Sequence, residues 1–90
     1  MNQELNHKLV NAINKTDVKN AVVELRKNGA IDQELTLSNY KNYVEIVSDK
    51  VASAYSRMDA YKELTESTLS GICQSRVKGL MRYIIACDTF

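Results

Sequence analysis

The sequence predicts an all-α fold, a small bundle of three or four helices in a single domain that spans residues 1–90. Two observations predict it. The 90 residues include no proline and three glycines, and 44% are hydrophobic, which argues against disorder and against turn-rich β architecture. Apolar residues also recur at steps of three and four along most of the chain, which is the spacing of one helix face.

The first two predicted helices are short. An amphipathic helix is expected over roughly residues 3–14, where the apolar positions are Leu5, Leu9, Ala12 and Ile13. A second helix is expected to be capped by Thr16 or Asp17, because their side-chain oxygens can accept from free N–H groups of its first turn. Gly29 is well placed as the left-handed residue after its end. The buried face of this second helix is predicted to hold Val18, Ala21, Val22 and Leu25.

The third predicted helix is the longest, from about residue 39 to about residue 64. Its apolar residues repeat with a period of about 3.5, which is the pattern of a helix that packs against a partner helix. This seam consists of Tyr40, Val44, Val47, Val51, Ala54, Met58 and Tyr61.

The length of that helix predicts self-association. A helix of about 25 residues is roughly 38 Å long, whereas a compact domain of this size has a diameter of about 31 Å. Part of the seam is therefore expected to pack against another copy of the chain, most simply in a two-fold homodimer and otherwise in a higher homo-oligomer. The residues predicted for this interface are Tyr40, Val44, Val47, Val51, Met58 and Tyr61.

An amphipathic C-terminal helix is predicted over about residues 66–87, after the poor helix formers of residues 65–68. Its apolar stripe consists of Leu69, Ile72, Cys73, Val77, Leu80, Tyr83, Ile84 and Cys87. The two cysteines would lie about 21 Å apart along the helix axis. That separation is too large for a disulfide within the chain, so both are predicted to be buried free thiols, with a bridge between two chains as the alternative.

The charge is small in sum and uneven in distribution. The net charge of +1 argues against a grossly basic nucleic-acid binder. Residues 31–66 hold seven acids and four bases, whereas residues 67–87 hold three bases and no acid. The N-terminus has no signal-peptide pattern, and no apolar run approaches the about 18 residues that span a membrane. A cytoplasmic protein without a membrane partner is expected.

The sequence does not predict an enzyme. It has one histidine, no glycine-rich phosphate loop and no recognisable nucleophile motif. Glu4 and His7 could together offer two ligands to a metal, but a stable site needs about four. We therefore expect no catalytic residue, metal or cofactor.

The candidate partner site lies on the C-terminal helix. Arg76 falls within the apolar arc of that helix, where a guanidinium must snorkel, pair with a carboxylate, or meet an anion or a partner. Lys78 and Arg82 lie on the opposite side as a small basic patch, and Tyr83 is close to Arg76. These four residues are predicted to bind a ligand or partner.

Residues 71–80 also resemble the turn and recognition helix of a helix-turn-helix, as in small phage repressors. The resemblance places Gly71 in the turn and extends over residues 66–82. It implies a dimeric DNA-binding transcriptional regulator. The residues that would face the DNA groove are Gln74, Ser75, Arg76 and Lys78.

The sequence is therefore compatible with three functions. The leading hypothesis is a small non-catalytic interaction protein, a regulator or inhibitor of the type found in phages and mobile elements. It would bind a host protein or an anionic ligand through helix surfaces. The alternatives are the helix-turn-helix DNA binder and an oligomeric protein that sequesters a nucleotide with Arg76, Lys78, Arg82 and a tyrosine.

Overall fold

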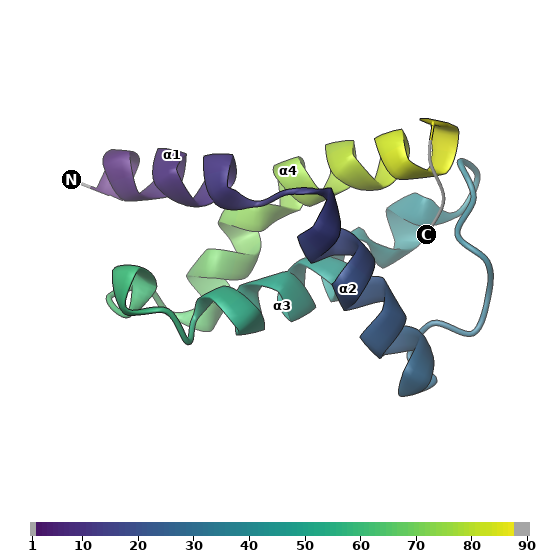
Figure 1. Ribbon diagram of the computed structural model, residues 1–90, viewed down its shortest axis with the longest axis horizontal. Coiled ribbons are helices and arrows are strands. Elements are labelled where there is room, and N and C mark those ends of the chain that lie inside the picture. The colour runs from purple at the N-terminus through teal and green to yellow at the C-terminus, as the bar shows by residue number, and fades with distance from the viewer. Residues whose placement is uncertain (1, 88–90) are drawn as a thin grey trace.

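The computed structural model describes residues 2–87, and all regular structure in that range is helical (Figure 1). Four α-helices are present in it, so the all-α prediction is confirmed. They are α1 (Asn2–Ala12), α2 (Lys15–Lys27), α3 (Val44–Tyr55) and α4 (Glu66–Cys87). The short 3-10 helices η1 (Tyr40–Tyr43) and η2 (Asp59–Tyr61) flank α3. The molecule measures 38 × 25 × 19 Å along its principal axes.

The core lies between α3 and α4, which make the largest helix–helix contact. Helix α2 packs across both of them, and α1 lies against α4 (Figure 1). The fully buried large side chains come from every helix and include Leu9, Val22, Val47, Leu69 and Met81. Their burial removes apolar surface from water and is the main force that holds the four helices together.

Helix α2 begins at a capping box. The side chain of Asn14 accepts a hydrogen bond from the N–H of Asp17 at 3.1 Å, and the carboxylate of Asp17 accepts one from the N–H of Asn14 at 3.0 Å. The prediction that Thr16 or Asp17 is the cap is wrong, because Asn14 is the N-cap and Asp17 completes the box from the third helical position. Gly29 has a φ of +76°, which confirms its predicted left-handed conformation.

The predicted long helix over 39–64 is wrong, because α3 has only 12 residues and is about 18 Å long. Before it, Thr36 and Asn39 exchange side-chain–backbone hydrogen bonds of 2.8 and 3.2 Å, which form a turn that leads into η1. After it, Met58 is extended and the chain reverses into η2. This reversal brings Tyr61 into the core, where its ring meets that of Tyr55 edge-on at 5.8 Å.

The reversal removes the length argument for an oligomer. Of the six residues predicted for the interface, Tyr40, Val44, Val47, Val51 and Tyr61 are buried within the single chain. Met58 is the sixth, and its side chain is 47% exposed. The seam therefore packs mainly inside its own subunit, and self-association stays a prediction.

Helix α4 covers the predicted residues 66–87. The hydroxyl of Thr65 accepts a hydrogen bond from the N–H of Thr68 at 3.1 Å, so the polar run that interrupts the apolar pattern starts the helix. The helix continues through Gly71. The resemblance to a helix-turn-helix therefore fails in its geometry, because no turn separates two helices at that glycine.

The two cysteines lie in different environments. Cys73 is fully buried, whereas Cys87 is exposed, so the prediction of burial is confirmed for the first thiol and wrong for the second. Burial raises the pKa of the Cys73 thiol to about 11, and the negative charge of Asp17 adds to the effect. A thiol reacts as its thiolate, so Cys73 is both shielded and predominantly protonated at neutral pH.

We predict that a thiol-reactive chromophore at about pH 8 labels one cysteine of the native protein quickly and the other only after denaturation. Substitution of Cys87→Ser should abolish the fast phase and leave the slow one. Stopped-flow absorbance would check this. Two equally fast phases in the native protein would contradict the burial of Cys73.

We also predict that Asn14→Ala lowers the free energy of unfolding by about 1 kcal/mol, because it removes the N-cap acceptor of α2. Urea denaturation followed by circular dichroism measures this loss. The control is Asn11→Ala at an exposed position of α1, which should change stability by less than about 0.5 kcal/mol. Equal effects of the two substitutions would contradict the role of the capping box.

Candidate functional site

Helix α2 carries opposite charges on its two exposed flanks. At about 100° per residue, Lys15, Lys19, Val23 and Arg26 lie along one flank. Asp17, Asn20 and Glu24 lie along the other. The first flank meets α4 through Lys15, and the second faces α3. Each flank contributes to one candidate surface.

The start of α2 is held by two side chains from other helices. The hydroxyl of Tyr55 lies 2.6 Å from Asp17 Oδ2 and 3.0 Å from the carbonyl oxygen of Ala12, and can donate its one proton to either. Arg76 Nε donates to the carbonyl oxygen of Ile13 at 3.1 Å. Arg76 thus binds the junction between α1 and α2, a partner that sequence reasoning did not identify.

The side chain of Tyr55 is held in its protonated form. Burial raises the pKa of this phenol far above its usual value, and the hydrogen bond to Asp17 raises it further. The neutral phenol is the form that donates to the carboxylate, so burial and the hydrogen bond favour the same protonation state.

Tyr83 connects the basic flank of α2 to α4. The Nζ atom of Lys15 lies 5.1 Å from the centre of the Tyr83 ring, within the range of a cation–π interaction. The Tyr83 side chain is 49% exposed. Together with Arg76, which lies seven residues earlier on the same flank of α4, it extends the basic flank of α2 onto a second helix.

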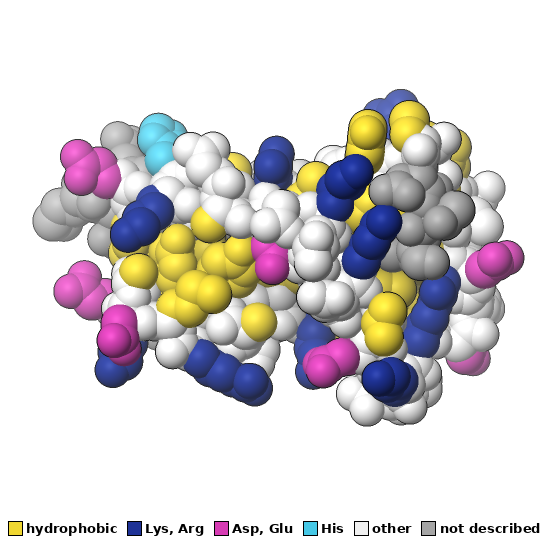
Figure 2. Space-filling view, viewed as in Figure 1, with side chains coloured by type: hydrophobic (Ala, Val, Ile, Leu, Met, Phe, Trp, Pro, Cys, Tyr) yellow, Lys and Arg dark blue, Asp and Glu magenta, His cyan; other side chains and the backbone are white. Residues whose placement is uncertain are grey.

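We call this two-helix region the basic surface. It consists of Lys15, Lys19, Val23 and Arg26 of α2 and of Arg76 and Tyr83 of α4. Figure 2 shows Lys and Arg side chains gathered on the half of this face that α2 and the C-terminal part of α4 occupy. The six residues include four cations and no acid.

The four residues predicted to bind a partner are divided between two flanks of α4. Arg76 and Tyr83 belong to the basic surface, whereas Lys78 and Arg82 are four residues apart on the other flank and are exposed. Sequence reasoning missed the contribution of α2. That contribution could have been recognised in the sequence, because Lys15, Lys19 and Arg26 are spaced so that they fall on one flank of a helix.

The residues predicted to contact DNA do not form one surface. Gln74, Ser75, Arg76 and Lys78 are spread around a continuous helix. Gln74 lines an open acidic cleft of about 650 Å³ between α3 and α4. The other residues of this cleft are Glu45, Asp49, Glu66, Ser67, Ser70 and Gly71. Three carboxylates beside Gln74 would repel a phosphate backbone.

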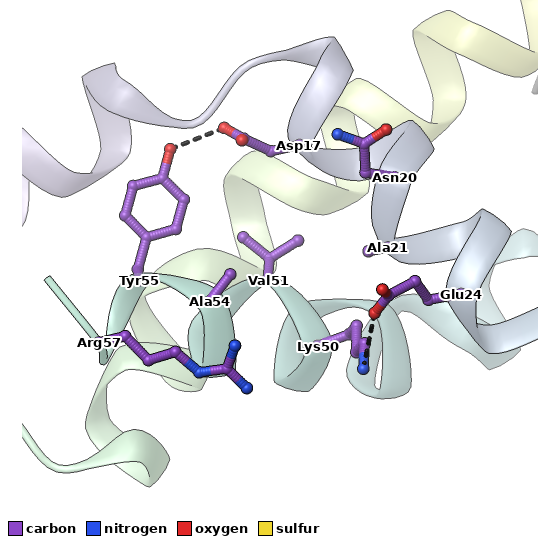
Figure 3. Close-up of a pocket in the computed structure, with 9 residues that line it drawn as sticks. All are labelled: Asp17, Asn20, Ala21, Glu24, Lys50, Val51, Ala54, Tyr55 and Arg57. Atoms are coloured by element: carbon purple, nitrogen blue, oxygen red, sulfur yellow. Dashed lines mark hydrogen bonds and ion pairs between the residues drawn. The ribbon is translucent and has the colours of Figure 1, made fainter. Parts of the chain in front are cut away.

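A second hollow lies between α2 and α3 on the acidic flank of α2, and we call it the α2–α3 groove (Figure 3). Its volume is about 240 Å³. Glu24 and Lys50 form an ion pair of 2.9 Å across it, and the hydrogen bond and positive charge of Lys50 lower the pKa of Glu24. The residues that line it are Asp17, Asn20, Ala21, Glu24, Lys50, Val51, Ala54, Tyr55 and Arg57.

The described residues include neither a candidate metal site nor a helix that could span a membrane. No group of three or more His, Cys, Asp or Glu side chains there is arranged to hold a metal ion. Asp49, in the acidic cleft, instead accepts a hydrogen bond from the hydroxyl of Ser70. No helix in this part of the chain has both the length and the apolar character needed to cross a membrane.

Comparison with known proteins gives no match: no family model fits the chain, and neither a curated protein nor a solved structure is significantly similar to it.

We predict that Tyr55→Phe lowers the free energy of unfolding by about 1.5–3 kcal/mol at neutral pH, because a hydrogen bond to a carboxylate is lost. Since the pKa of Tyr55 is raised on folding, its contribution is complete below about pH 10, the usual value for a phenol, and declines as pH rises further. The difference in stability between the native protein and the variant should therefore shrink above about pH 10.

Urea denaturation across this pH range measures that difference. The control is Tyr40→Phe, because Tyr40 is also buried and no hydrogen bond from its hydroxyl contributes to the start of α2. A difference between the native protein and Tyr55→Phe that stays constant with pH would show that the hydroxyl does not donate to Asp17.

Proposed function

We propose that this chain is a non-catalytic interaction protein that binds an acidic protein partner through the basic surface. The observation that carries the proposal is that four cations and two exposed apolar side chains lie on facing flanks of two helices. Lys15 and Tyr83 join the two helices at its centre, where the cation lies over the ring.

Charge is the first support for an acidic partner. The six described residues of the basic surface include no acid, and the acids of α2 lie on its other flank. At its margin, Asp32 and Glu34 line a hollow beside Arg26. A face of one sign attracts a partner of the opposite sign and speeds their encounter, and like charges exclude wrong partners. This separation of charge exists although the net charge is only +1.

Exposed apolar side chains are the second support, and they favour a protein over a nucleic acid. Val23 is 44% exposed and Tyr83 is 49% exposed. Aromatic and arginine side chains contribute most to binding energy at protein interfaces. A surface built only to hold phosphate would gain little from Val23.

The two other hypotheses have less support. A helix-turn-helix needs a turn at Gly71, which lies inside α4. Nucleotide sequestration would combine Arg76, Lys78, Arg82 and a tyrosine, but Arg76 and Lys78 lie on opposite flanks of that helix. An anionic small ligand could still be held by Arg76 and Tyr83 alone.

We predict that a photo-crosslinking residue in place of Tyr83 captures a protein when the chain is incubated with an extract of its source cells. The same residue in place of Leu37, which is 54% exposed but lies outside the basic surface, should capture none. Mass spectrometry identifies the adducts, and nuclease treatment should leave them unchanged.

Charge reversal tests the electrostatic part of this proposal. Lys19→Glu together with Arg26→Glu should reduce the yield of the adduct at least about tenfold, the equivalent of 1.4 kcal/mol. The matched control reverses Lys41 and Lys62, which changes the net charge equally outside the basic surface, and should leave the yield unchanged. A nucleic-acid adduct, equal capture from positions 83 and 37, or no adduct would overturn the proposal.

A further inference from the structure

The α2–α3 groove has walls of opposite charge. The wall from α2 presents the acids Asp17 and Glu24, with Asn20 between them. The wall from α3 and the residues after it presents the bases Lys50 and Arg57. The four formal charges cancel, so the groove attracts neither an anion nor a cation as such, and it suits a ligand that carries both.

The two ends of the groove differ. At one end Glu24 and Lys50 pair across it at 2.9 Å and satisfy each other. At the other end Asp17 and Arg57 come from opposite walls and are not joined to each other (Figure 3). Within the described residues the guanidinium of Arg57 takes part in no ion pair, although its positive charge contributes to the lowered pKa of Glu24. This end therefore presents a cation without a direct partner opposite a carboxylate.

The floor between these ends is apolar and small. It is formed by Ala21 and Val51, and Ala54 lies at its exposed edge. The two alanines keep the groove open, since any longer side chain at these positions would fill it. The volume of about 240 Å³ is below the range of about 300–1,000 Å³ of pockets for drug-sized ligands, so the occupant must be smaller.

Tyr55 closes the end of the groove beside Asp17. Its hydroxyl lies 2.6 Å from Asp17 Oδ2, which also accepts the N–H of Asn14. These contacts fix the carboxylate in position before any ligand arrives, and a preorganised partner group costs less ordering on binding.

We propose that the α2–α3 groove binds a small zwitterion of amino-acid size. Its ammonium group lies against Asp17 and Asn20, its carboxylate lies against Arg57, and its apolar part covers Ala21 and Ala54. This site is on the flank of α2 opposite the basic surface, so it is independent of the proposed protein partner and adds a second binding activity to the chain.

Titration of the isotope-labelled protein with each of the twenty proteinogenic amino acids tests this proposal by ¹H–¹⁵N NMR. At least one of them, at millimolar concentration, should shift the amide signals of Ala21, Val51 and Ala54 in a saturable manner. Its N-acetyl derivative lacks the cation and its methyl ester lacks the anion, so neither should bind.

Two variants separate the site from a nonspecific effect. Ala54→Leu fills the groove and should abolish the shifts, whereas Ala86→Leu, at an exposed position of α4, should preserve them. Arg57→Gln should weaken binding about tenfold, as expected for a lost charged hydrogen bond, and Lys41→Gln should not. Failure of all twenty amino acids to bind, or equal binding of either derivative, would overturn the proposal.

Discussion

The rest of the structure depends on how the chain is fixed at the junction between α1 and α2. A local capping box sets where α2 begins, and the hydroxyl of Tyr55 shares the Asp17 carboxylate that completes the box. Arg76 binds the carbonyl of Ile13 on the other side of the junction. These contacts fix the rotation of α2 about its axis, and that rotation decides which residues face α3, α4 and solvent.

Helix α2 therefore divides the surface of the molecule. Its apolar stripe is buried in the core, and its two remaining flanks are a cationic one beside α4 and an anionic one beside α3. A single helix with two charged flanks of opposite sign can support two different recognition surfaces without a large net charge. This arrangement explains why the charge of the whole chain gave no indication of either surface.

The sequence predicts the fold class and the limits of α4, because a long apolar stripe follows a clear run of polar residues at 65–68. The apolar repeat over residues 40–61 predicted too long a helix around α3. Tyr61 fits the spacing of that repeat, but it reaches the core because the chain reverses before it and not because the helix continues. The basic surface and the α2–α3 groove could not be predicted from one helix at a time. Both depend on how α2 crosses its neighbours, as Lys15 and Tyr83 show.

The contacts at the junction also imply an order of events in folding. The capping box joins residues three apart, so it can form as soon as the first turn of α2 does. The hydrogen bonds of Tyr55 to Asp17 and of Arg76 to Ile13 span 38 and 63 residues, and such distant closures carry a larger entropic cost. Because the contacts that orient α2 close over much longer stretches of chain than the box that starts it, we expect the orientation of the helix to be set later in folding than its first turn.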